Sequence, residues 1–212
     1  MLAAALVLAA CQNDGGPGQC FESGATGYPF IMPGDSTAWF HWLAQDYPIR
    51  VYAEPVGATV ANTDTAIAIW LSAFRCGELN LVRWSDSMTA DIIVRNPAFP
   101  PPIPLIRHTV AADSITACGG RTDISAWDST GVFPRPIHSY IWPLGGDAAA
   151  TASCYRFVTL HELGHTLGLF GHSPDTVDIM YHRPRRREIS INDRYTIQVL
   201  HSYTPSLRAE LR

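Results

Sequence analysis

Three histidines and a glutamate in one short segment have the types and spacing of a hydrolytic metal site. Residues 161–172 read HELGHTLGLFGH, with His161 and His165 four positions apart. On a helix, this spacing directs both imidazoles to the same side, at a separation that suits two Zn–N bonds of about 2.0–2.1 Å. The segment therefore predicts a helix that presents His161 and His165 as zinc ligands.

Glu162 follows the first histidine directly, so it can reach a coordinated water without binding the metal. Zinc lowers the pKa of such a water toward about 7. We expect Glu162 to take a proton from this water as it attacks the scissile carbonyl, and to pass the proton to the leaving amine. Glu162 is therefore interpreted as the general base of a zinc-dependent endopeptidase.

A catalytic zinc usually has three protein ligands and one open position. A straight helix cannot supply a ligand seven residues beyond His165, because the chain would have moved about 10 Å along the helix axis. Gly168 favours a turn, since glycine enters the left-handed region without penalty. The chain can then fold back and bring His172 to the metal. If the third ligand lies elsewhere, the next candidates are Asp175, Asp178 and Glu188.

This segment and the residues after it resemble the matrixin branch of the metzincins. The family pattern is HExxHxxGxxH followed by a methionine-containing turn beneath the zinc, and Met180 in the sequence DIMY matches that turn. The third histidine comes one position later than in the pattern, so residues 170–171 must form a bulge, which Gly171 makes easy. Residues 189–200 are similar to the C-terminal matrixin helix, and residues 90–95 to its third strand.

The resemblance implies an α+β fold of the metzincin type. Its parts are a twisted five-stranded mixed sheet, an active-site helix, a C-terminal helix and a cleft between two unequal halves. It also implies one catalytic zinc and a protein or peptide substrate. The family loop that binds structural zinc and calcium has no clear match after residue 95, so a calcium site is unsupported.

Residue patterns predict the elements that must position this segment. Apolar alternation favours strands at residues 49–54, 81–84, 92–95, 121–127 and 137–142, with a proline-rich loop at 96–104. Helices are expected at residues 64–74, 149–168 and 192–201, with Ser190 near the start of the last. Asn62 or Thr63 is a candidate cap for the first helix. In the second helix, the side with Phe157, Leu160, Gly164 and Leu167 is expected to face the sheet.

The N-terminal sequence MLAAALVLAAC predicts export. Its apolar run is too short to span a bilayer, which needs about 20 residues, but it fits a secretory signal. The last four residues of the run resemble a bacterial lipobox, which predicts lipidation of Cys11; a plain signal peptide with a chance cysteine is the alternative. We expect a signal at residues 1–10, a tether and N-terminal segment at 11–44, and a catalytic domain at 45–205. The mature protein would be a membrane-anchored lipoprotein that faces the periplasm or the cell exterior.

Composition supports a folded, exported domain. Hydrophobic residues make up 47% and charged residues 16% of the chain, and the net charge of −4 gives no indication of a nucleic-acid surface. A monomer is expected. Beside Cys11, the four cysteines Cys20, Cys76, Cys118 and Cys154 suggest two disulfides, and their pairing stays open.

Two other functions fit parts of the sequence. A gluzincin would take its third ligand from a downstream glutamate, but neither Glu188 nor Glu210 lies in a clear helical context. A non-catalytic, zinc-stabilised surface lipoprotein would not need the base Glu162. A run of arginines at residues 183–187 is either a solvated loop or a site that attracts acidic substrates or anionic surfaces.

Overall fold

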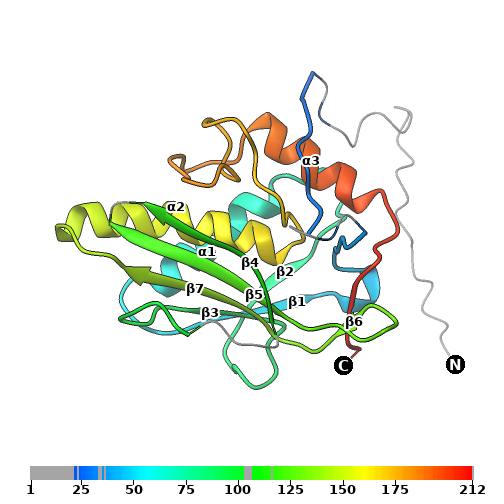
Figure 1. The fold of residues 1–212 in the computed structure, drawn as a ribbon, viewed down its shortest axis with the longest axis horizontal. Coiled ribbons are helices and arrows are strands. Elements are labelled where there is room, and N and C mark those ends of the chain that lie inside the picture. The colour runs from blue at the N-terminus through cyan, green and yellow to red at the C-terminus, as the bar shows by residue number, and fades with distance from the viewer. Residues whose placement is uncertain are drawn as a thin grey trace, which may run out of the picture.

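One mixed β-sheet carries the fold, and helices cover one of its faces (Figure 1). The structure, a computed structural model, describes residues 22, 24–32, 35, 37–102, 107–115 and 117–211. The described helices are α1 (Thr59–Leu71), α2 (Ala148–Thr166), α3 (Ile191–His201) and the short 3-10 helix η2 (Ala44–Asp46). The strands are β1 (Ile49–Ala53), β2 (Leu81–Trp84), β3 (Ile92–Arg95), β4 (Arg107–Ile115), β5 (Cys118–Ser125), β6 (Val132–Phe133), β7 (Ile137–Pro143) and β8 (Arg208–Ala209).

The main sheet has six strands in the order β2-β1-β3-β7-β5-β4. Neighbours from β2 to β7 are parallel, whereas β5 is antiparallel to both β7 and β4. The predicted α+β class, mixed sheet, active-site helix and C-terminal helix are confirmed. The structure adds β4 to the five expected strands. This strand lies at the edge, where only one side needs a partner, and its sequence RHTVAADSI lacks the apolar alternation of a buried strand.

Helix α1 begins earlier than expected. Its N-cap is Ala58, and no side chain caps it. The predicted caps Asn62 and Thr63 are instead buried inside the helix, where the Thr63 hydroxyl donates to the Thr59 carbonyl at 2.8 Å. The cap prediction was wrong because threonine can satisfy its hydroxyl within a helix as well as at its start. In α3, by contrast, Ser190 is the N-cap, as expected.

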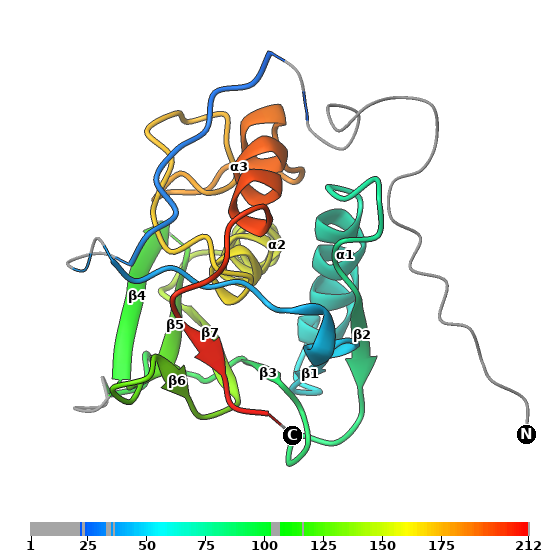
Figure 2. The same ribbon diagram turned by 90° about the vertical axis from the view of Figure 1, so that its right-hand side faces the viewer.

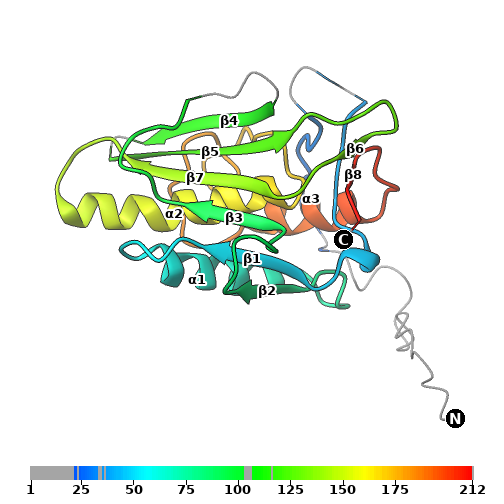
Figure 3. The same ribbon diagram turned by 90° about the horizontal axis from the view of Figure 1, so that it is seen from below.

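The side of α2 that faces the sheet also differs from the prediction. A Cβ atom on Gly120 of β5 would lie 2.3 Å from Val158 and 2.4 Å from Glu162, so these two residues face the sheet. Leu160 lies toward α1 instead, and its carbonyl accepts a bond from the Trp70 indole at 2.8 Å. Residues 158–166 of α2 are all buried, so apolar periodicity does not distinguish the side that faces the sheet from the side that faces α1. Figure 3 shows α1 and α2 side by side behind the sheet.

The described core begins upstream of residue 45. Tyr28, Phe40 and Trp42 are all buried in it. The Trp42 indole donates to the Thr166 carbonyl at 2.9 Å, at the last residue of α2. In Figure 2 this upstream segment, in blue, crosses near α3 and the loops that follow α2. It therefore supports the end of the helix that carries the candidate site.

One disulfide ties α2 to the sheet. Cys118 of β5 is bonded to Cys154 of α2, with an S–S distance of 2.09 Å. Cys76 is disulfide-bonded as well. Cys20 and the predicted lipidation site Cys11 lie outside the described residues, as does the expected signal at residues 1–10. Within the described chain, no helix combines the length and the apolar character needed to cross a bilayer.

Candidate active site

Helix α2 presents His161 and His165 from one side, with their ring centroids 4.6 Å apart and both side chains buried. Each Nδ1 atom lies beside a backbone carbonyl: Ile179 O at 2.7 Å for His161 and Leu169 O at 2.5 Å for His165. A carbonyl can only accept, so both Nδ1 atoms carry the proton. The Nε2 lone pair of each ring is therefore the one available to a metal.

The chain turns back after α2 and brings His172 to the other two histidines. Gly168 has a φ of 107°, and a Cβ atom there would lie 1.8 Å from the Phe40 carbonyl oxygen, so only glycine fits this turn. A Cβ atom on Gly171 would lie 2.1 Å from the Pro29 carbonyl oxygen. The His172 ring centroid lies 5.3 Å from that of His161 and 5.2 Å from that of His165.

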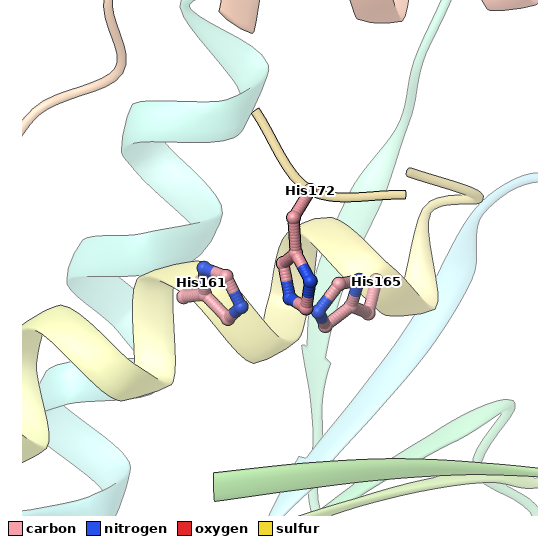
Figure 4. A group of neighbouring side chains, drawn as sticks. All are labelled: His161, His165 and His172. Atoms are coloured by element: carbon pink, nitrogen blue, oxygen red, sulfur yellow. The ribbon is translucent and has the colours of Figure 1, made fainter. Parts of the chain in front are cut away.

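Figure 4 shows the His172 ring pointing from its loop toward the two rings on α2. One possible ligand atom from each histidine lies within 4.8 Å of the others, and within the described residues this is the group placed to hold a metal ion. The alternatives Asp175, Asp178 and Glu188 are not part of it. Three imidazoles suit zinc and other late first-row metals, whereas calcium and magnesium prefer oxygen ligands.

Met180 packs against α2 at Gly164, between the positions of His161 and His165. Its side chain is fully buried, and its sulfur would lie 2.6 Å from a Cβ atom on Gly164 of α2. Its carbonyl accepts from the Ser173 amide at 2.9 Å, which joins the methionine turn to the strand-like segment after His172. The glycine allows the turn to approach the helix between the two histidine positions.

Asp193 at the start of α3 holds the methionine turn in place. Its carboxylate accepts from the backbone amides of Ile179 at 2.9 Å and Ser190 at 2.7 Å. The Tyr28 hydroxyl from the N-terminal segment donates to it at 2.7 Å. Burial raises the pKa of the Asp193 carboxyl, while these hydrogen bonds act in the opposite direction. Because the Ile179 carbonyl contacts His161, Asp193 fixes a metal-ligand candidate through one intermediate residue.

The carboxylate of Glu162 is fully buried between α2 and β5. Its Oε2 atom accepts a hydrogen bond from the Thr122 hydroxyl at 2.7 Å. Gly120 makes room for it, because a Cβ atom there would lie 2.4 Å from Oε1. The sequence did not indicate Thr122 or Gly120 as site residues, because they lie about forty positions upstream of the motif and cannot bind a metal through their side chains. The sheet thus holds the Glu162 carboxylate, whereas carbonyls of the following loops hold the rings of His161 and His165.

The mixed sheet, the helix α2 beneath it and the three convergent histidines together form a candidate metal site on an α+β fold. The family model described as Matrixin matches residues 109–202, which include β5, α2, the methionine turn and α3. The matched region is therefore similar to the matrixins, and it makes up somewhat under half of the chain. No curated protein matches the chain.

Proposed function

We propose that this protein is a zinc-dependent endopeptidase that acts as a monomer on protein or peptide substrates. The observation that carries the proposal is the convergence of His161, His165 and His172 beside the buried carboxylate of Glu162. Zinc held there supplies Lewis-acid chemistry, which lowers the pKa of water toward about 7 and polarises a carbonyl.

The chain's own residues supply the remaining parts of the reaction. His161 and His165 are oriented by the carbonyls at their Nδ1 atoms, so each offers its Nε2 atom as a ligand. Glu162 takes the proton of the attacking water and passes it to the leaving amine nitrogen. Thr122 keeps the Glu162 carboxylate in one orientation through its hydrogen bond, so the base does not have to reorganise during the reaction.

Digestion of casein with and without a zinc chelator tests this function. Zinc-loaded protein is expected to digest casein, to lose this activity in 1,10-phenanthroline, and to regain it when zinc is restored. Far-UV circular dichroism shows whether the metal-free protein remains folded. Undiminished digestion by protein shown to be metal-free would exclude zinc chemistry. A zinc-loaded protein that digests neither casein nor a diverse peptide library at pH values of about 6 to 9 would favour the non-catalytic binding protein.

We propose further that Cys11 carries lipid and anchors the exported protein to a membrane. The support is the sequence LAAC after an apolar run. Full-length protein from cells is expected to fractionate with membranes, and mass spectrometry of its mature N-terminal peptide should show an acylated Cys11. Several acyl chains are expected, because a single chain binds only marginally. The Cys11→Ser variant should leave the membrane fraction, and an unmodified Cys11 in the mature wild-type protein would contradict the anchor.

A further inference from the structure

A groove of about 240 Å³ opens between α1 and α2. Ala66 and Ile69 of α1 and Leu160 of α2 give it an apolar lining. Leu160 directly precedes His161, and consecutive helix positions point about 100° apart, so the groove and the candidate metal ligands lie on different sides of the same helical turn. The remaining lining residues are polar or small and include Asn62, Thr65, Arg156 and Arg187.

Two arginines place positive charge on this groove. Arg156 and Arg187 both line it, and both side chains are exposed. Arg187 is held against α2: its guanidinium carbon lies 5.8 Å from the Phe157 ring centre, and its Nη2 atom lies 3.5 Å from the Ser153 hydroxyl. Within the described chain, the ion pairs of arginine involve other positions. The two guanidinium groups therefore keep their capacity to bind an added carboxylate.

The same charge extends toward the candidate metal site. Arg183, Arg185 and Arg186 are also exposed, and they follow His182, whose ring centroid lies 6.4 Å from that of His172. The segment 183–187 thus starts beside one metal-ligand candidate. Its last residue, Arg187, packs on the ring of Phe157, which lies one helical turn before His161. We call Arg156, Arg183, Arg185, Arg186 and Arg187 together the arginine edge.

We propose that the groove between α1 and α2, with the arginine edge around it, binds an acidic side chain of the polypeptide substrate. The proposal rests on the proposed function for its role in catalysis, where it would make acidic substrates preferred. Arginine forms paired hydrogen bonds with carboxylates, and the apolar lining suits the methylene groups of a glutamate. A concave site of this volume accepts a side chain, whereas a flat anionic surface reaches only its rim.

Two peptides that share one cleavable sequence and differ only in Glu or Gln at flanking positions test the preference. An exposed arginine–carboxylate contact changes an affinity by about two- to fivefold, so the two groove arginines together should favour the Glu peptide by about tenfold in kcat/KM. The Arg156→Gln/Arg187→Gln variant is expected to lose the preference and to cleave the Gln peptide as before. The preference should also weaken in about 1 M salt, where the screening length is about 3 Å.

Arg75→Gln/Arg208→Gln is the matched control, because it also removes two positive charges, both from exposed positions outside the groove. It should retain the preference for the Glu peptide. An equal loss in Arg75→Gln/Arg208→Gln and in the groove variant would show that overall charge, and not the groove, selects the substrate, and it would overturn the proposal. Equal cleavage of the Glu and Gln peptides by the wild-type enzyme would also overturn the groove proposal, but it would leave the proposed peptidase function standing.

Binding measured without hydrolysis separates this proposal from the proposed function. Fluorescence anisotropy of the dansyl-labelled Glu and Gln peptides is recorded with zinc-loaded Glu162→Ala protein. Tighter binding of the Glu peptide, lost when Arg156 and Arg187 are also replaced by Gln, supports the groove even if no peptide is cleaved. If instead only phosphatidylglycerol vesicles bind, and bind through these arginines, the arginine edge contacts lipid and the substrate groove is excluded.

Discussion

The Glu162→Ala variant is expected to lose nearly all peptide hydrolysis while it keeps its fold and its zinc. The three histidines form the candidate ligand group without Glu162, so zinc binding does not depend on the carboxylate. A general base typically contributes about 10²–10⁴-fold to the rate, and kcat should fall by at least that order. The measurements are kcat and KM on a cleavable peptide, zinc content by metal analysis, and circular dichroism.

Glu188→Ala is the matched control, since it removes an exposed glutamate that is not part of the ligand group. It should hydrolyse peptide at the wild-type rate. Thr122→Val keeps the base but removes its hydrogen bond, so a smaller loss of kcat is expected, with recovery in Thr122→Ser. A Glu162→Ala protein that is folded, zinc-loaded and still fully active would show that the proton is taken elsewhere.

The local parts of the site could be predicted because they depend on spacing along one segment. His161 and His165 share a side of α2 for the reason that any residues four apart on a helix do. Gly168 has the positive φ that its place after the helix required. The strand positions at 49–53, 81–84 and 92–95 also agree with short apolar runs, because each of these strands buries apolar side chains in the core.

The parts that depend on tertiary contacts could not be predicted. Thr122 and Gly120 contact Glu162 only because β5 packs against α2, and no local sequence pattern predicts that contact. The edge strand β4 lacks apolar alternation, so the sequence showed no strand there. The side of α2 that faces the sheet was predicted wrongly for a related reason. A helix that is buried on nearly all sides has no single apolar stripe that indicates its packing partners.

The role of Asp193 could be predicted only in part. Its capping box with Ser190 is a local signal, and it predicts a helix start. The second use of the same carboxylate, toward Ile179 and the Tyr28 hydroxyl, joins segments 14 and 165 positions away. A residue that appears to be an ordinary cap therefore also anchors the methionine turn, and through it the orientation of His161.

The His172→Ala variant is expected to bind zinc far more weakly than the wild-type protein. Loss of a residue that merely orients a ligand typically lowers metal affinity by about 10–100-fold, so loss of the third ligand itself should cost at least about 100-fold. Metal analysis after dialysis against a weak chelator measures this, and hydrolysis should fall with zinc occupancy. The fold should persist, because His172 is half-buried and the turn before it is fixed by Gly168 and by Gly171.

His182→Ala provides the control for this experiment. Its ring lies 6.4 Å from that of His172, yet it is exposed and is not part of the ligand group, so zinc should be retained. Full zinc retention in His172→Ala would place the third ligand elsewhere, and the substitutions Asp175→Ala, Asp178→Ala and Glu188→Ala would then identify it. Zinc loss only in His172→Ala would show that the bulge at residues 170–171 delivers the ligand one position later than the matrixin pattern. In that case the glycine turn and the backbone of Pro29, and not the spacing alone, determine which histidine reaches the metal.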